Sequence, residues 1–305
     1  MQKHIPVLLN ETIQILKVEE GDTVVDCTLG DGGHAQEIAK KIGEKGLLIG
    51  IDLDERNVDA FNELNLANAK GVKGNFKDIA GIINKFGLRR VTKIVADLGF
   101  SSRQLDTISG LSFQEDSALD MRLSSEDALT AEEIVNQYPV AKLTEIFKNY
   151  GEETKARLIA EEIIKRRKKR RIRSSKDLAE IVQACYGGKI RVRGMNVSTK
   201  VFMALRIAVN DELGNLEALL QSSLECLQPG GRIAIISFHS LEDRIVKNFF
   251  RRESKGCICE EEPQCQCSHQ PQFKLLTKHP ITASVEEIQN NPRSRSARAR
   301  AAEKI

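Results

Sequence analysis

Val24-Val25-Asp26-Cys27-Thr28-Leu29-Gly30-Asp31-Gly32-Gly33-His34 is the stretch that decides the fold of this 305-residue chain. An apolar pair leads into an acidic residue, three glycines follow within four positions, and residues 35–39 have helical character. The stretch therefore predicts a strand, a tight loop and the start of a helix. Glycines let a backbone turn sharply and approach a ligand, and the N–H groups of a first helical turn offer hydrogen-bond donors. We expect this loop to bind a ligand.

Strands and helices alternate along the first third of the chain. Residues 47–51 are a continuous apolar run, as expected for a strand buried on both faces of a parallel sheet. This alternation predicts an α/β fold, in which ligands bind at the carboxyl ends of the strands. Three expected strands end in an acid: residues 23–26 at Asp26, residues 47–51 before Asp52, and residues 91–96 before Asp97.

After Asp97 the alternation stops and helical segments follow. The apolar spacing predicts helices at residues 131–136, 143–149, 154–170 and 176–184. The sheet pattern resumes with one long helix over residues 199–227 and a strand over residues 232–237. We therefore expect an all-helical insertion, residues 106–197, between two parts of one α/β domain, residues 1–105 and 198–305.

Two classes of ligand fit the glycine loop. Gly30, Gly32 and Ala35 match a dinucleotide fingerprint, and Asp52 follows about twenty residues later, where an acid that binds a ribose belongs. This pattern indicates an NAD-dependent oxidoreductase. Asp26 argues against it, because a carboxylate there would repel a pyrophosphate. S-adenosylmethionine, which has a ribose, cationic groups and no phosphate, suits the same acids better.

The distribution of charge indicates a polyanionic partner. The net charge is only +3, but residues 165–173 include eight Lys or Arg in nine positions. Such density favours binding to RNA phosphates over a merely solvated surface. A non-catalytic RNA-binding or assembly protein is therefore a further alternative. Arginines that extend the basic zone, or form a disordered tail, are Arg191, Arg193, Arg293, Arg295, Arg298 and Arg300.

The chain shows no expected signal peptide and no apolar run long enough to span a membrane, so we expect a cytoplasmic protein. Seven cysteines in that compartment argue against a disulfide framework. Four of them, Cys257, Cys259, Cys265 and Cys267, lie within eleven residues, close to His269. The pattern leaves open a structural zinc site or a loop of reduced thiols, and we assign no metal to the catalytic site.

Several longer motifs resemble the bacterial RsmH (MraW) family. They are DCTLGDGGH at 26–34, DLGFSSRQLD at 97–106, LDMR at 119–122, ALRIAVNDEL at 204–213 and ISFHSLEDR at 236–244. The resemblance extends from His4 to Ser296. It implies a class I methyltransferase sheet with S-adenosyl-L-methionine as cofactor. It also implies methylation of the exocyclic N4 of a cytidine in the decoding region of 16S rRNA, within the small ribosomal subunit.

The same resemblance implies the residues of the cofactor site. Those expected to line the methionine side are Gly32, Gly33 and His34. Asp52 would hold the ribose hydroxyls and Phe76 would lie beside the adenine. Asp97 and Gln104 would complete the pocket. The helical insertion would help to present the RNA.

Catalysis on an exocyclic amine requires positioning and hydrogen-bond acceptors, because the N4 lone pair is delocalised into the ring. Asp97 is followed by an aromatic residue, Phe100, and the loop after residues 232–237 contains Phe238 and His239. The ring of Phe100 or of Phe238 would stack on an extruded base. The alternative is that these rings pack in the hydrophobic core. His239 would accept the proton after transfer, or fix its loop by a hydrogen bond.

Overall fold

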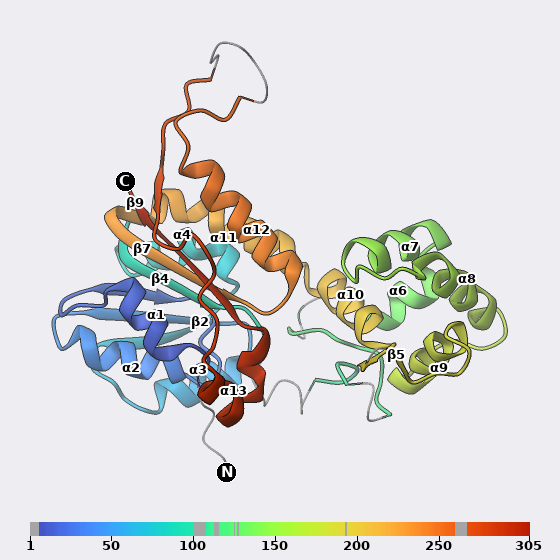
Figure 1. Cartoon of the computed structure of the whole chain (residues 1–305). Coiled ribbons are helices and arrows are strands. Elements are labelled where there is room, and N and C mark those ends of the chain that lie inside the picture. Colours follow the sequence, from blue (N-terminus) through green and yellow to red (C-terminus); the bar gives the residue numbers. More distant parts are fainter. Residues whose placement is uncertain are drawn as a thin grey trace. The chain divides into compact units, whose positions relative to one another are not determined.

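The computed structural model describes residues 6–99, 108–112, 116–124, 126, 128–192, 194–259 and 267–305. The chain divides into two compact units (Figure 1). We call Met1–Ser101 with Leu213–Ile305 the sheet unit, and Ser102–Glu212 the helical unit. No helix in the described ranges combines the length and the apolar character that crossing a membrane would require.

A sheet of seven strands, in the order β3-β2-β1-β4-β7-β9-β8, forms the centre of the described part of the sheet unit (Figure 1). Strands β3, β2, β1, β4 and β7 are parallel, and β9 runs antiparallel to both of its neighbours. The α/β fold is therefore confirmed. The strands are β1 (Thr23–Asp26), β2 (Leu47–Asp52), β3 (Ala69–Lys73), β4 (Val91–Asp97), β7 (Leu227–Ser237), β8 (Phe273–Leu275) and β9 (Arg298–Lys304).

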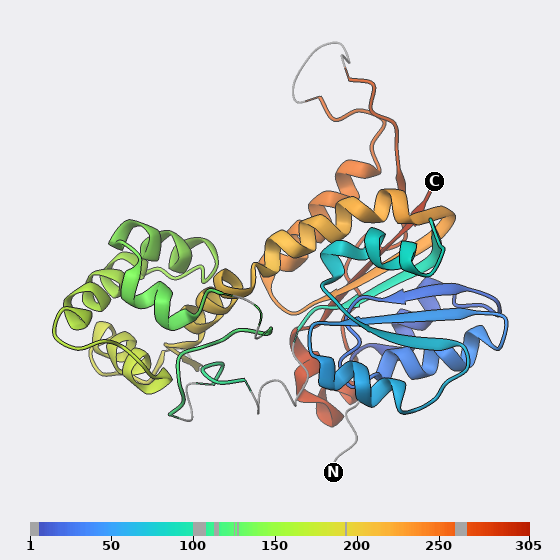
Figure 2. The ribbon, with the colours of Figure 1, turned by 180° about the vertical axis from the view of Figure 1, so that it is seen from behind.

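The sheet is covered on both faces, because neighbouring residues of a strand point to opposite sides. Val24 belongs to a buried cluster with residues of α1 and α2, whereas Val25 belongs to one with residues of α4, α11 and α12 (Figure 2). The helices of this unit are α1 (Leu9–Leu16), α2 (Gly33–Ile42), α3 (Glu55–Asn62), η1 (Phe76–Asp78), α4 (Ile79–Lys85), α11 (Glu212–Cys226), α12 (Ser240–Glu253), α13 (Val285–Asn290) and η2 (Pro292–Ser296).

The helical unit has a core of its own. Buried side chains from each of its helices, among them Ile134, Phe147 and Ile163, form one apolar cluster. The residues between the two parts of the sheet thus form a unit made mainly of helices. Its elements are α6 (Ala131–Gln137), α7 (Val140–Asn149), α8 (Ala156–Arg167), α9 (Ser175–Cys185) and α10 (Thr199–Asn210), with a short hairpin of β5 (Arg191–Val192) and β6 (Met195–Asn196).

The helix expected over residues 199–227 is two helices. Asp211 has a φ of 47°, a left-handed conformation that ends α10 before α11 begins at Glu212. Aspartate tolerates this conformation better than most residues. The buried face of α10, which includes Phe202 and Leu205, packs in the core of the helical unit. The structural division therefore falls at residue 212, whereas the sequence pattern placed residue 198 onward with the sheet.

The C-terminal arginines do not form a disordered tail. Arg298 and Arg300 lie in β9, which pairs with β7 on one side and β8 on the other. Alanines 299, 301 and 302 of this strand are buried in the sheet. Arg300 donates two hydrogen bonds to the carboxylate of Asp243 in α12, at 2.6 and 3.2 Å. This arginine is therefore not available to RNA.

Candidate functional site

The candidate site lies where β1 and β4 end, side by side in the sheet. The chain leaves β1 toward β2 on one side of β1, and β4 lies on the other side. This is a topological switch point, where ligands bind in open α/β sheets. Asp26 ends β1, Asp97 ends β4, and residue 28 links them, since the Asp97 N–H donates to Thr28 Oγ1 at 2.6 Å.

The loop after β1 is held at its three glycines. Gly32 caps α2 with a φ of 75°, and a Cβ there would lie 2.9 Å from the ring of Phe61. A Cβ on Gly33 would lie 2.3 Å from Cγ of Pro6. The N–H of Gly30 donates to Oδ2 of Asp52 at 2.7 Å. The loop therefore has no room for side chains at Gly32 and Gly33. Gly30 has a left-handed φ of 51°, and its N–H ties the loop to the end of β2.

Asp26 and Asp97 form a concentrated acidic centre. Oδ1 of Asp26 accepts the N–H of Thr28 at 3.1 Å. In the described part of the chain, neither Oδ2 of Asp26 nor Oδ1 of Asp97 has a hydrogen-bond partner, although both atoms are buried. Burial raises the pKa of Asp26 to about 7, and the charge of Asp52 adds to that rise. Burial, followed by the charges of Asp26 and Glu242, also raises the pKa of Asp97 well above its ordinary value.

Burying two carboxylate oxygens without hydrogen-bond partners lowers the stability of the fold, unless a ligand donates hydrogen bonds to them. A cationic ligand would satisfy both atoms and favour their ionised form. A pyrophosphate would add negative charge beside them and is therefore excluded on electrostatic grounds. The arrangement fits a ligand that has cationic or N–H groups at this end, as the sequence predicted.

His34 lies at the same centre, in the first turn of α2. The ring is buried, its Nε2–H donates to the carbonyl of Val7 at 3.0 Å, and its Nδ1 lies 3.8 Å from Oδ2 of Asp97. The carbonyl of Val7 selects the tautomer, because it can only accept. His34 thus presents its second nitrogen toward the acidic centre.

Asp52 lies at the end of β2 and is well prepared to accept further donors. Its carboxylate accepts hydrogen bonds from the N–H groups of Gly30 and Asp54 and from the amide of Asn57. An ionised carboxylate has about four acceptor positions. One of them, on Oδ1, is left among the described contacts, which suits a ligand hydroxyl. Burial raises the pKa of Asp52, against the effect of these three hydrogen bonds.

Phe76 lies close to Asp52 through the backbone. The N–H of Gly74 donates to the carbonyl of Asp52 at 2.9 Å, and Phe76 begins the short helix η1 two residues later. Its ring is half-buried against the core. The structure therefore places six of the seven expected residues at the ends of the strands or in the segments that follow them. They are Gly32, Gly33, His34, Asp52, Phe76 and Asp97.

Comparison with known proteins agrees with this site. The model of the MraW methylase family matches residues 1–305. The chain belongs to the MraW methylase family. Similar proteins named "Ribosomal RNA small subunit methyltransferase H" include those of Carboxydothermus hydrogenoformans (46% identical, covering 99% of this chain and 98% of the relative), Halothermothrix orenii (42%; 100% and 99%) and Clostridioides difficile (41%; 99% and 99%).

Among solved structures, one titled as a putative rRNA-methylase from Clostridium thermocellum is 14% identical, covers 99% of this chain and 98% of its own, and has a TM-score of 0.44. That likeness is too low to add to the argument. Membership of a methylase family identifies the protein as a methyltransferase with a class I methyltransferase fold. It removes the oxidoreductase and the non-catalytic protein that the sequence pattern had left open.

In this methylase, His239 is the residue that begins α12. Its Nδ1 accepts the N–H of Glu242 at 3.4 Å, and the Glu242 carboxylate accepts the N–H groups of Phe238 and His239 at 2.9 and 3.2 Å. In sequence, Ser240 with Asp243 also has the spacing of a capping box, but the structure forms the cap one residue earlier, with His239 and Glu242. Nε2 of His239 lies 3.2 Å from Oε1 of Glu242. This geometry fixes the loop after β7; a role in proton transfer stays a prediction.

Phe238 packs beside the end of β4. A Cβ on Gly99, whose φ is 151°, would lie 3.1 Å from the Phe238 ring. The ring is also half-buried in a cluster that contains Ile236. The close approach of ring and backbone therefore needs a glycine in this loop. Phe100 and Gln104, also expected at the site, lie outside the described residues.

The basic stretch 165–173 is less available to RNA than its sequence suggested. Arg167 donates to the backbone carbonyls of Val135 and Tyr138 within the helical unit. Other members form ion pairs with Glu162, Glu132 and Asp177 of the same unit. Among the described residues, those of the stretch that are exposed and have no acidic partner are Lys168, Lys169 and Arg173.

Proposed function

We propose that this methyltransferase uses S-adenosyl-L-methionine to methylate the exocyclic N4 of a cytidine in the decoding region of 16S rRNA. The observation that carries the choice of donor is the pair of buried, partnerless oxygens, Asp26 Oδ2 and Asp97 Oδ1. The relatives' name, ribosomal RNA small subunit methyltransferase H, supports the RNA. A ribosomal substrate implies a cytoplasmic enzyme.

S-adenosyl-L-methionine, when bound, supplies an electrophilic methyl group on a sulfonium. The residues present fit it: the acidic centre of Asp26 and Asp97 suits its cationic end, with Gly32, Gly33 and His34 beside it. Asp52 accepts a ribose hydroxyl at its remaining acceptor position, and Phe76 covers the adenine. Gln104 completes the set that the family resemblance implies.

The acceptor amine needs acceptors from the chain, because N4 becomes nucleophilic only when its lone pair leaves the ring plane. Oδ1 of Asp97 has no partner among the described residues and has two acceptor positions, so beside the cationic end of the donor it can also accept this hydrogen bond, and we assign it that role. His239 then holds the loop after β7. Because its Nδ1 accepts the Glu242 N–H, the neutral ring carries its proton on Nε2, so in our assignment the released proton goes to Nδ1 once this cap contact opens. Phe238 offers an aromatic face for the base.

The RNA contact of the helical unit rests on its exposed, unpaired cations. We assign phosphate binding to Lys168, Lys169 and Arg173, at and after the end of α8. Each phosphate that a cation neutralises adds to the salt dependence of binding, so the loss of such a contact reduces it. Replacing all three with Gln should weaken binding to 16S rRNA and flatten its dependence on salt. A matched variant with the same loss of charge on the sheet unit is Lys41→Gln, Lys45→Gln and Lys85→Gln, which are exposed. Equal effects of the two triple variants would contradict the assignment.

The decisive experiment maps the product. Small subunits from cells that lack this enzyme are incubated with the protein and labelled S-adenosyl-L-methionine, and nuclease fragments of the 16S rRNA are analysed by mass spectrometry. We expect one added methyl group on a cytidine of the decoding region, recovered as N4-methylcytidine. Methylation of carbon or ribose, or of another RNA only, would overturn the proposal. Thermal stabilisation by S-adenosylhomocysteine, with none by NAD, tests the donor separately.

A further inference from the structure

A long connection between α12 and β8 contains a cluster of thiols. The connection begins after Glu253 and ends at Phe273, and its base is closed because the N–H of Gln272 donates to the carbonyl of Glu253 at 2.7 Å. It extends beyond the end of α12 in both views of the ribbon (Figures 1 and 2). Its described residues, 254–259 and 267–272, form neither helix nor strand, and Ile258 is their only large aliphatic residue. An apolar core therefore does not account for their order.

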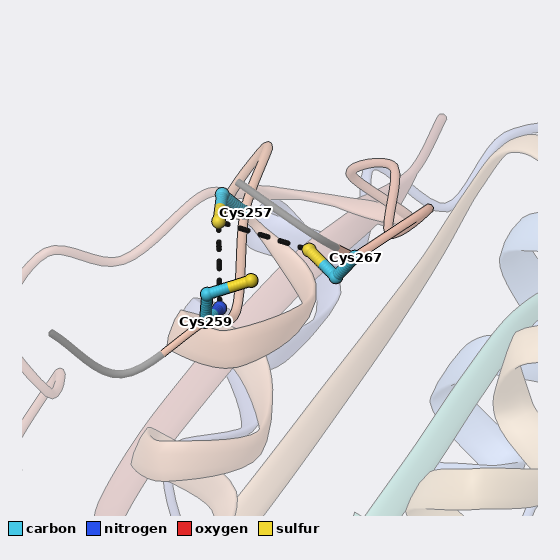
Figure 3. Close-up of side chains that lie close together, drawn as sticks. All are labelled: Cys257, Cys259 and Cys267. Carbon is cyan, nitrogen blue, oxygen red and sulfur yellow. Dashed lines mark hydrogen bonds between the residues drawn. The ribbon is translucent and has the colours of Figure 1, made fainter. Parts of the chain in front are cut away.

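Three sulfurs of this connection converge. Sγ of Cys257 lies 3.7 Å from Sγ of Cys267, and the sulfurs of Cys257, Cys259 and Cys267 all lie within 4.8 Å of one another (Figure 3). The backbone N–H of Cys259 donates to Sγ of Cys257 at 3.4 Å. Such an N–H···S contact favours a sulfur that carries negative charge. The sulfurs come from both arms of the connection, so a shared ligand would hold the two arms together.

The separation of the sulfurs identifies the chemistry. Sulfurs bound at about 2.3 Å to one tetrahedral Zn²⁺ lie about 3.8 Å from each other, which matches the contact between Cys257 and Cys267. A disulfide would need about 2.05 Å and would leave the third thiol without a role. Thiolates in a tetrahedral arrangement select Zn²⁺ or an iron–sulfur cluster over harder cations. Three sulfurs within 4.8 Å of one another, one pair of them at the tetrahedral separation, favour a single zinc ion.

We propose that Cys257, Cys259 and Cys267 bind one structural Zn²⁺ as thiolates. On binding, each thiol releases its proton to solvent and a Zn–S bond forms in its place. The bound ion stabilises the connection between α12 and β8, as a hydrophobic core stabilises other parts of the chain. The site is separate from the acidic centre at β1 and β4, and no step of methyl transfer depends on it.

The fourth ligand position belongs to water or to another side chain. Cys265 is the sequence neighbour that the spacing offers, but it lies outside the described residues and forms no part of the proposed set. His269 is not a member of the cluster. Its Nε2 lies 3.9 Å from Oε2 of the buried Glu253 of α12, and this pair lies at the base of the connection.

The test measures metal in the full-length protein, purified without a metal-affinity tag or chelator from cells grown with zinc. Elemental analysis should find about one zinc per chain, and the Cys257→Ser variant should lose it. Cys185→Ser, which alters a thiol of α9 in the helical unit, should keep it. Replacement of zinc by Co²⁺ should give the absorption of tetrahedral cobalt thiolate. Cys265→Ser decides the fourth ligand: zinc loss assigns Cys265, and retention assigns water.

A second measurement covers the case in which a variant fails to fold. Chelation of the wild-type protein should make Lys255, which is exposed in the connection, a site of rapid tryptic cleavage, and added Zn²⁺ should restore protection. Zinc below about a tenth of an equivalent in the wild-type protein, iron in its place, or a disulfide between Cys257 and Cys267 would each overturn the proposal. Activity is not the readout, so failure here would leave the proposed methyl transfer untouched.

Discussion

Replacing Asp26 with Asn should stabilise the protein while weakening its ligand binding. Asp26 is 2% exposed, and burial raises its pKa from 3.8 to about 7. The folded state therefore binds this proton more tightly than the unfolded state does. Stability from this group is present at low pH and is lost as the pH rises from about 4 through about 7. Asparagine keeps the acceptor for the Thr28 N–H and has no charge to desolvate.

The size of the effect follows from the shift. With values of 3.8 unfolded and about 7 folded, Asp26 lowers the free energy of unfolding by about 2 kcal/mol between pH ~5.5 and pH ~8.5. Urea denaturation of the ligand-free protein at these two pH values measures it. In Asp26→Asn, the decrease in the free energy of unfolding between these two pH values should be smaller than in the wild type by about 2 kcal/mol. Asp59→Asn, at an exposed position of α3, should keep the fall of the wild type.

Binding should change in the opposite direction. Asp26→Asn removes a buried anionic acceptor, and a hydrogen bond to a charged group contributes about 1.5–3 kcal/mol, or roughly 10- to 100-fold in affinity. Calorimetry with S-adenosyl-L-methionine at pH ~8 measures the loss. Wild-type protein should also release protons on binding at pH ~6.5, because a cation lowers the pKa of Asp26 and Asp97. The reasoning would be refuted if the stability of Asp26→Asn depended on pH as strongly as that of the wild type. An unchanged affinity of this variant for S-adenosyl-L-methionine would refute it as well.

Two further changes test the loop after β7 and the C-terminal strand. His239→Ala should cost about 1 kcal/mol of stability through loss of the α12 cap. His239→Asn should restore stability, because asparagine can also cap a helix. Loss of methylation in both variants would assign a catalytic role to the imidazole of His239. Methylation restored together with the cap would show that His239 only positions the loop. Asp243→Ala should cost about 3–5 kcal/mol in urea denaturation because it leaves Arg300 buried and unpaired; a loss below about 1 kcal/mol would contradict the buried pair. Burial raises the pKa of Asp243, but Arg300 and Arg298 outweigh it and lower that pKa overall, so the pair's contribution should disappear only in strong acid.

The strands that carry the acids were predictable because apolar residues predominate before each acid, most clearly in the run at residues 47–51. Residues 23–26 match β1 at both ends, and residues 91–96 match β4 apart from Asp97, which the structure includes in the strand. An aspartate at the end of such a run marks the edge of the sheet. The loop of Gly30 and Gly32 was predictable because closely spaced glycines after a strand indicate a tight turn. In the structure both glycines have the positive φ that such a turn requires. Local sequence therefore determines these parts of the candidate site.

Other parts depend on contacts that no local pattern reports. Strand β9 has alanines and arginines in place of β-branched residues, and its order comes from pairing with β7 and β8. Asp211 interrupts a sequence that is helical on both sides, and only its left-handed backbone ends α10. The cap of α12 moved to His239 because Glu242, not Asp243, returns the hydrogen bond to the cap. Asp243 is engaged by Arg300 instead.

The C-terminal segment, which the sequence suggested for RNA contact, supports the site from two directions. In α13, Glu287 accepts the N–H of Leu8 at 2.8 Å, and the carbonyl of the preceding Val7 accepts the Nε2–H of His34. On the other side, Ser237 donates to the carbonyl of Arg298 in β9 at 3.2 Å. Ser237 is the last residue of β7, directly before the loop that contains His239.

Arg300 ties the same strand to α12, whose first turn holds that loop. Arg298 and Arg300 are therefore used inside the sheet unit, where both pair with the carboxylate of Asp243. Within the basic stretch 165–173, the exposed cations for which the described residues show no acidic partner are Lys168, Lys169 and Arg173. Counting basic residues along a chain overstates its nucleic-acid surface whenever some of them, like Arg300, neutralise a buried carboxylate.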